Sequence, residues 1–258
     1  LVKSVSRSTI NRVLNNRQAA VKKRRLKLKK HRLRYELAIP GQRLQVDVKY
    51  SPMLVGGKTV YIYVAVDECT RWRFAFAYDE LNAHWTVDFL DRLSKACPFP
   101  IWTIQTDNGP EFTYSLLGNG LGVHPMDTWC EQRSIRHRLI PPGVKELNGK
   151  VERSHRIDAD YFYGRAPTAT LALFNRALAQ WISFYVTHRP HGGLAYQTPL
   201  EKLKERISAL KTEVVPEALE PVRQRFLKDG PRFIMNQTER QLLAFDLGIN
   251  LHEVDKAS

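Results

Sequence analysis

Hydrophobic and polar residues follow strand-like and helix-like periods through the middle of the chain. From residue 43 to 50, apolar and polar side chains alternate, as in a strand with one buried face. Further runs rich in β-branched and aromatic residues predict strands at 58–67, 71–80, 101–107 and 135–140. Gly56 and Gly57 are a hairpin signal, and the short connections among the first three runs predict an antiparallel meander.

Helical spacing of apolar residues separates and follows these runs. It predicts helices at 82–97, near 125–133, at 145–163 and at 171–189. The resulting order, βββαβαβαα, predicts an α/β fold with a mixed five-stranded sheet flanked by helices. Outside this region we expect a short helix at 4–16, and a mostly helical tail that is interrupted at the prolines of VVPEALEPV.

The net charge of +14 comes from one segment. Residues 1–35 contain 13 Lys and Arg and no Asp or Glu, whereas the other 223 residues contain 27 basic and 26 acidic ones. A basic segment with a single Phe, Trp or Tyr favours a nucleic acid over a membrane as partner. No apolar run reaches the ~18 residues that span a bilayer. The alternative is a solvated tail. The candidate DNA contacts here are Lys22, Lys23, Arg24, Arg25, Lys27, Lys29 and Lys30.

The cysteines and the first residue bear on the setting of the protein. Cys69, Cys97 and Cys130 are odd in number and form no CxxC pair, which predicts free thiols in a reducing compartment. The chain begins with Leu1 in an already helical pattern, so we expect the natural N-terminus to lie further upstream.

Three carboxylates occupy positions suited to a metal site. Asp47 lies in the middle of the first predicted strand, opposite its apolar face, where an unpaired charge is costly. Asp107 ends the fourth predicted strand, and ligands gather at the carboxyl ends of strands in such sheets. The helix face around Glu152 also carries basic and amide side chains, at Lys145, Asn148 and Arg156. If the three acids converge, they suit two Mg²⁺ ions acting on a phosphodiester.

Each acid also has an ordinary structural interpretation. Asp-Asn-Gly at 107–109 is a common turn. Glu152 could form an exposed ion pair with Arg156. Asp47 could cap a backbone group or pair with Lys49. Two further acids near strand ends are rivals, either beside the metal ligands or merely solvated: Asp67 and Glu111.

The motifs LQVDVKY, VAVDECTRW, QTDNGPEF, LNGKVERSHR and VTHRPHGGLAYQTPLEKL, in this order, resemble the catalytic core of the DDE transposase and integrase family. The similarity is to bacterial insertion-sequence transposases, which are related to retroviral integrases, and covers about residues 41–203. It implies an RNase H-like fold and a catalytic, metal-binding triad of Asp47, Asp107 and Glu152. It also implies two Mg²⁺ ions, with Mn²⁺ as a substitute. Asp67 is similar to a family acid that is not usually a ligand.

Two departures from the family pattern leave the acids in place. Between Asp107 and Glu152 there are 44 residues, more than the family usually has. We expect the surplus in the Gly-rich stretch TYSLLGNGLGVHP, because long surface loops cost little free energy. Leu147 stands where a polar residue is more usual. Neither change removes a carboxylate.

The resemblance implies a Mg²⁺-dependent polynucleotidyl transferase that cleaves a DNA strand at an element end and transfers the freed 3′-OH to target DNA. SRSTINRVLNN is similar to the last helix of a helix-turn-helix domain. The expected parts are a helix-turn-helix remnant with the basic arm, the catalytic core and a helical tail, at 1–40, 41–203 and 204–258.

We expect the partners to be element-end DNA, target DNA and further copies of the chain, in the bacterial cytoplasm at the nucleoid and away from membranes. The DNA contacts expected near the metals are Lys145, Asn148, Lys150, Arg153 and Arg156. Two other functions stay open at this point. One is a DNA-binding transposase remnant without activity, and the other is an RNase H-like nuclease that only hydrolyses.

Overall fold

The computed structural model describes residues 6–14, 36–117, 122–141 and 145–229. Contacts divide the chain into two units, Leu1–Glu36 and Leu37–Ser258. In the first unit, residues 7–14 form a helix that lies inside the helix predicted at 4–16. Its apolar side chains are 46–49 % exposed, at Ile10, Val13 and Leu14.

The second unit is built on one mixed sheet of five strands. The strands are β1 Leu44–Tyr50, β2 Tyr61–Asp67, β3 Arg73–Tyr78, β4 Thr103–Thr106 and β5 Arg136–Leu139. They lie in the order β3-β2-β1-β4-β5, with β1, β2 and β3 antiparallel, β4 parallel to β1, and β5 parallel to β4. The predicted mixed sheet and its meander are therefore confirmed, and each strand lies within the run that predicted it.

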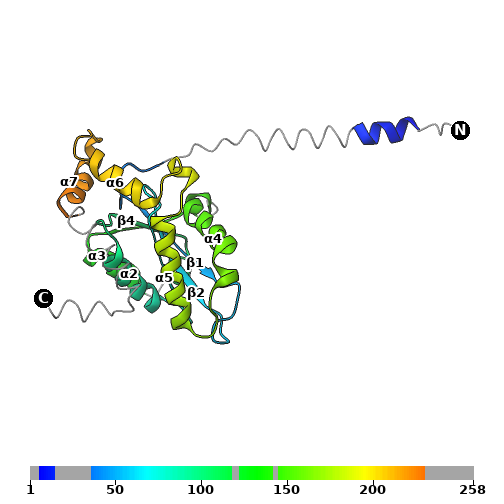
Figure 1. The fold of residues 1–258 in the computed structure, drawn as a ribbon, viewed down its shortest axis with the longest axis horizontal. Coiled ribbons are helices and arrows are strands. Elements are labelled where there is room, and N and C mark those ends of the chain that lie inside the picture. Colours follow the sequence, from blue (N-terminus) through cyan, green and yellow to red (C-terminus); the bar gives the residue numbers. More distant parts are fainter. Residues whose placement is uncertain (1–5, 15–35, 118–121, 142–144, 230–258) are drawn as a thin grey trace. The chain divides into compact units, whose positions relative to one another are not determined.

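Helices cover both faces of this sheet. They are α2 Ala83–Ala96, α3 Pro125–Gln132, α4 Gly149–Tyr161, α5 Leu171–Thr187, α6 Pro199–Ala209 and α7 Glu220–Asp229. Short 3-10 turns join them: η1 Lys145–Asn148, η2 Tyr163–Arg165, η3 Gly192–Leu194 and η4 Glu217–Leu219. In Figure 1, α2 and α3 lie on one side of the sheet and α4 and α5 on the other.

Local sequence explains where these elements begin and turn. The Asn82 side chain accepts a hydrogen bond of 3.0 Å from the Trp85 amide and so caps α2. Gly56 and Gly57 have φ of +57° and +77°, which glycine adopts without a steric penalty. They form the tight turn of a small hairpin between β1 and β2, as the sequence predicts.

The core lies where the two helical layers meet the sheet. Tyr63 of β2 is fully buried, and its ring packs against those of Phe89 and Phe112 at centroid distances of 5.4 and 6.3 Å. All three cysteines are buried free thiols, and burial raises the pKa of Cys130 to about 12. Within the described ranges, no helix is both long and apolar enough to cross a membrane.

The C-terminal tail is helical where the structure describes it. It contains most of α6 and all of α7, separated at the predicted proline-marked break. The boundary expected between 203 and 204 falls inside α6. Residues 230–258, including the stretch TERQLLAFDLGINLHEV that predicts an amphipathic helix, lie outside the described residues.

Candidate active site

Asp47 lies in the middle of β1, the central strand of the sheet. Alternation along the strand places it on the same face as Gln45, the face that α4 covers. The Oδ2 atom of Asp47 is 3.1 Å from Nε2 of His155, which lies on α4. This contact offsets the free-energy cost of placing the Asp47 carboxylate in the middle of a strand. The partner of Asp47 is thus His155, and not Lys49 as the sequence also allowed.

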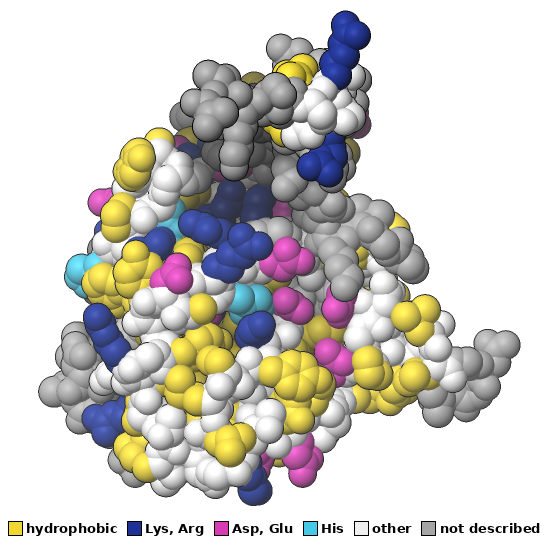
Figure 2. Space-filling model, turned by 90° about the vertical axis from the view of Figure 1, so that its right-hand side faces the viewer, with side chains coloured by type: hydrophobic (Ala, Val, Ile, Leu, Met, Phe, Trp, Pro, Cys, Tyr) yellow, Lys and Arg dark blue, Asp and Glu magenta, His cyan; other side chains and the backbone are white. Residues whose placement is uncertain are grey.

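Glu152 lies in the first turn of α4, where a negative charge is favourable. It is exposed and lines a hollow of about 540 Å³ together with Asp47, His155 and Arg156. On the face shown in Figure 2, Asp and Glu side chains gather beside Lys and Arg side chains. The structure thus brings two of the three predicted acids, from a strand and a helix, to one open hollow.

Asp107 follows β4 directly and is exposed. Its Oδ1 atom accepts a hydrogen bond of 3.1 Å from the Gly109 amide, and Asn108 donates one of 2.7 Å to the carbonyl of Ile140. A Cβ atom on Gly109 would lie 2.6 Å from the carboxyl group of Glu111, so a larger residue would force Glu111 to move. The Asp-Asn-Gly turn therefore fixes the chain beside the strand end.

The pKa of Glu111 shows that Asp47 and Asp107 act on the same region of the surface. Burial raises the pKa of Glu111, and the charges of Asp107 and Asp47 raise it further. Asp107 and Asp47 therefore both act on one half-buried carboxyl group. Such mutual repulsion is the situation that a divalent cation relieves.

The donor chemistry of these residues fits Mg²⁺, which prefers carboxylate oxygens and retains several waters. As the side chains stand, no three His, Cys, Asp or Glu residues within the described ranges form a group that could hold a metal ion. Asp47 is turned toward His155, and Asp107 accepts from Gly109. To share one ion, the three carboxylates would have to rotate toward one another.

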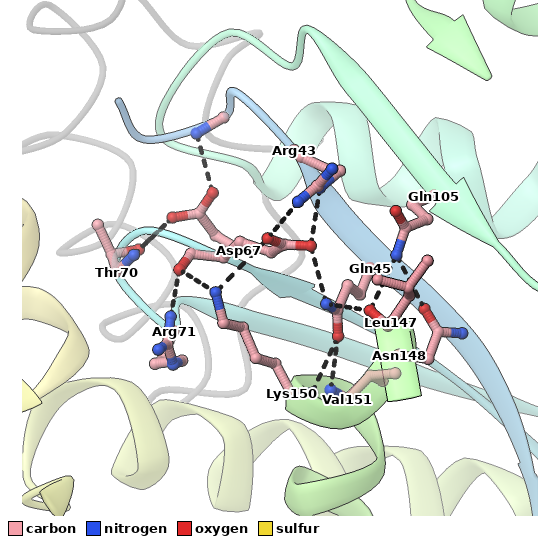
Figure 3. A network of polar contacts seen from close by, with 12 residues as sticks. Arg43, Gln45, Asp67, Thr70, Arg71, Gln105, Leu147, Asn148, Lys150 and Val151 are labelled. Carbon is pink, nitrogen blue, oxygen red and sulfur yellow. Dashed lines mark hydrogen bonds and ion pairs between the residues drawn. The ribbon is translucent and has the colours of Figure 1, made fainter. Parts of the chain in front are cut away.

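The start of α4 is held to the sheet by glutamines (Figure 3). Asn148, at the N-cap position, makes no capping bond with its side chain. Instead, Oε1 of Gln45 accepts from the amides of Lys150 and Val151, at 3.0 and 3.1 Å. Nε2 of Gln45 donates to the carbonyl of Leu147 at 2.8 Å. Because Gln45 is two residues before Asp47, this long-range cap fixes the helix of Glu152 relative to the strand of Asp47.

A second glutamine repeats this contact from β4. Nε2 of Gln105 donates to the Leu147 carbonyl at 3.0 Å and to Oδ1 of Asn148 at 3.4 Å. Gln45 and Gln105 are directly paired across β1 and β4. The strand that contains Asp47 and the strand that ends just before Asp107 are thus both bonded to the turn that leads into α4.

The buried carboxylate of Glu68 completes the polar network that joins the start of α4 to the sheet. This network, called the frame, consists of Arg43, Gln45, Glu68, Gln105 and Lys150. Glu68 accepts from Arg43 through Nε and Nη2, both at 2.8 Å, and from Nε2 of Gln45 at 2.8 Å. The Nζ atom of Lys150 lies 3.0 Å from the Glu68 carbonyl and 3.5 Å from its Oε2. Burial and the nearby charge of Arg71 lower the pKa of Lys150. Lys150 therefore reaches into the frame rather than outward from α4.

Asp67 is fully buried and directly precedes Glu68 of the frame. It accepts hydrogen bonds from the Gly41 amide at 3.0 Å and from the Thr70 amide and hydroxyl at 2.7 and 2.8 Å. Burial raises the pKa of Asp67, while these bonds lower it. Of the two rival acids, Asp67 is enclosed away from the hollow and Glu111 lies close to the candidate ligands.

The remaining predicted DNA contacts have different surroundings. Arg153 and Arg156 are exposed on α4, and Arg156 lines the hollow. Asn148 is only 4 % exposed. Lys145 lies in η1, but its side chain is outside the described part. Also outside it are the basic-arm residues Lys22, Lys23, Arg24, Arg25, Lys27, Lys29 and Lys30.

Sequence reasoning missed three residues that the structure places around the acids. They are Gln45, Gln105 and His155. Gln45 and Gln105 each stand two residues before a candidate acid, on the same strand face, and His155 is three residues after Glu152 on the helix. This spacing places them beside the acids, but only the tertiary contacts reveal their roles.

Comparisons with known proteins agree with this architecture. Two sequence profiles, both described as an integrase core domain, match residues 38–145 and 133–199. The putative integrase ORF3 of Spiroplasma virus SpV1-C74 is 29 % identical over 202 residues, covering 73 % of this chain and 54 % of that protein. An uncharacterised 39.2 kDa protein of insertion element IS476 from Xanthomonas euvesicatoria is 25 % identical over 202 residues, covering 77 % and 55 %. The chain thus spans about half the length of these relatives.

Among solved structures, the fold is similar to a chain in the cryo-EM structure of the simian T-cell lymphotropic virus intasome in complex with PP2A regulatory subunit B56 gamma. The TM-score is 0.52 at 17 % identity, covering 71 % of this chain and 60 % of that one. This likeness supports the predicted RNase H-like fold. The order of strands, the two matching profiles and the curated relatives lead to one conclusion: the chain belongs to the family of integrase and transposase catalytic cores.

Proposed function

We propose that this chain is the catalytic core of a DNA transposase or integrase, which cleaves a DNA strand at an element end and transfers the freed 3′-OH to target DNA. The observation that carries the proposal is that Asp47 of β1 and Glu152 of α4 line one open hollow. Asp107 stands at the end of β4, the strand next to β1. Membership of the integrase core family supports the assignment.

In this proposal the three acids are metal ligands. Asp47 and Asp107 would hold one Mg²⁺ ion, and Asp47 with Glu152 a second, with Mn²⁺ as a substitute. A bound pair of such ions activates an attacking oxygen and stabilises the leaving oxygen in an in-line displacement at phosphorus.

Side chains in and around the hollow would orient the acids and the DNA. The contact from His155 directs the Asp47 carboxylate toward α4. Gln45 fixes the first turn of α4 and with it the backbone of Glu152. The exposed guanidinium groups of Arg153 and Arg156 would contact phosphates, which positions DNA without reading its sequence.

The hollow also contains tyrosines, which raises the alternative of a covalent tyrosine intermediate. Burial raises the pKa of Tyr163 well above its ordinary value, and its hydroxyl group has no hydrogen-bond partner within the described residues. A phenolate nucleophile is therefore disfavoured at Tyr163. A metal-dependent transfer needs no covalent protein intermediate, so the acids suffice.

The partners follow from the reaction. Strand transfer joins an element end to target DNA, so both would bind, and two ends in one reaction would require further copies of the chain. We place this activity in the bacterial cytoplasm, at the nucleoid. Because the chain spans about half of its curated relatives, these statements about the whole protein belong to the proposal.

The test uses a labelled oligonucleotide duplex that carries the terminal sequence of the element, together with an unlabelled target plasmid. We expect Mg²⁺-dependent cleavage followed by covalent joining of the labelled 3′ end to the plasmid. Asp47→Asn and Asp107→Asn should each abolish both steps. Cleavage without joining would instead identify a nuclease that only hydrolyses. DNA binding without cleavage or metal binding, the latter measured by calorimetry, would identify an inactive remnant.

A further inference from the structure

A second hollow lies on the same face of the sheet as the acids, at the opposite ends of the strands. Its volume is about 210 Å³, and its wall includes Arg43, Trp102, Arg136, Arg138, Leu219 and Val222. Register explains its position, since Thr103 of β4 pairs with Arg136 of β5, and Gln105 with Arg138. Paired residues share a face, so both arginines lie on the side where Gln105 meets Leu147.

The charges of this hollow are not balanced. Arg43 is paired with Glu68. Within the described part of the chain, the side chains of Arg136 and Arg138 have no hydrogen-bond or ion-pair partner, and no Asp or Glu lines the hollow. The Cα atoms of Arg136 and Arg138 are about 7 Å apart, because the two residues are separated by one residue along β5. Two positive charges therefore face the same small hollow, and a bound anion would relieve their mutual repulsion.

The chemistry of the wall selects the kind of anion. Guanidinium groups form planar, bidentate hydrogen bonds with phosphate oxygens. Trp102 adds a partly buried aromatic side chain, a surface suited to the apolar parts of a nucleotide. From Thr103 to Asp107 the chain advances four residues, about 13 Å along a strand, which corresponds to roughly four nucleotides at 3.4 Å each.

We propose that Arg136 and Arg138 bind a phosphate of the DNA backbone, a few nucleotides away from the phosphodiester held at the acids. The inference rests on the proposed function, because it places the DNA on the face that carries Asp47, Asp107 and Glu152. A competing explanation is that charged residues on the edge strand β5 merely discourage pairing with another sheet. That explanation requires no ligand.

The experiment measures binding of a fluorescein-labelled DNA duplex by anisotropy over a series of KCl concentrations, using the full chain. Each phosphate contact contributes about 0.9 to the slope of log affinity against log salt. The double variant Arg136→Gln/Arg138→Gln loses one phosphate contact and should lower this slope by about 0.9. The matched control Arg165→Gln/Arg176→Gln removes the same charge from exposed positions elsewhere and should leave the slope unchanged.

Two further measurements separate the explanations. The Arg136→Lys/Arg138→Lys variant keeps the charge and should keep most of the slope, with an unchanged melting temperature. Equal slopes for wild type and the Gln variant would overturn the proposal and favour edge protection. Inorganic phosphate that binds through these arginines in calorimetry, without a change in the DNA slope, would also overturn it, since the site would then take a small anion.

Failure of this site and failure of the proposed function have different signatures. Glu152→Gln should remove cleavage and leave the slope of the salt dependence unchanged. A wild-type chain that binds DNA but does not cut it would contradict the proposed function. The slope of the Arg136 and Arg138 variants would still decide whether DNA binds at the second hollow.

Discussion

The most informative perturbation of the frame is Gln45→Met, which keeps the size of the side chain but removes its amide. Four hydrogen bonds are lost, to the amides of Lys150 and Val151, the carbonyl of Leu147 and Oε1 of Glu68. Glu68 retains Arg43, and the Leu147 carbonyl retains Gln105, so the cost falls mainly on the amides of Lys150 and Val151. At about 1 kcal/mol for each amide, the variant should lose about 2 kcal/mol of stability.

The assay is urea denaturation together with metal-dependent DNA cleavage. Gln105→Met is the matched control, because Gln105 makes one short bond, at 3.0 Å, and one long bond, at 3.4 Å. It should lose only about 1 kcal/mol. Gln45→Met should also slow cleavage more than it weakens DNA binding, since Glu152 would no longer be fixed against β1. Equal losses of stability for the two variants would refute the role of Gln45 as the cap of α4.

Two other predictions concern buried charges. The Asp158 side chain is 1 % exposed and is bonded to Arg73 and Trp181. Arg73→Met leaves this buried carboxylate without its counter-ion and should lower the free energy of unfolding, measured by urea denaturation, by about 3–5 kcal/mol. A loss below about 1 kcal/mol would contradict this expectation. Burial, reinforced by Arg189, lowers the pKa of His191 from 6.5 to about 4. Between these two pH values, His191 is protonated in the unfolded chain but neutral in the folded chain. The free energy of unfolding should therefore fall as the pH drops from about 6.5 to about 4. His191→Gln should weaken that pH dependence, and an unchanged pH profile would count against it.

The fold was largely predictable because its signals are local. Alternation in 43–50, the paired glycines at 56–57 and the helical spacing in 82–97 each act within a few residues. The observed elements fall inside those limits. Sequence periodicity does not specify which strand lies next to β1, since β4 reaches it only after α2. The resemblance to the family supplied that long-range information.

The site was predictable in its acids but not in their surroundings. The pairing of Asp47 with His155 joins residues 108 positions apart, which helix and strand periods do not relate. Lys150 and Asn148 were expected near DNA because they share a motif with Glu152. Tertiary bonds to Glu68 and Gln105 turn both toward the frame instead. Helical spacing gives the side of a helix but not the partner that covers it.

Nicking of supercoiled plasmid in Mg²⁺ is the measurement that decides whether Glu152 belongs to a metal-dependent cleavage site. The matched control is Asp160→Asn, which neutralises another exposed acid on the same helix. We predict that wild type and Asp160→Asn nick the plasmid, while Glu152→Gln is slower by at least about a hundredfold, because a ligand of a catalytic metal contributes several kcal/mol. Equal nicking by Glu152→Gln and wild type would show that Glu152 is not a ligand of a catalytic metal. The absence of both nicking and metal binding in wild type would show that the chain is not a metal-dependent nuclease or transferase.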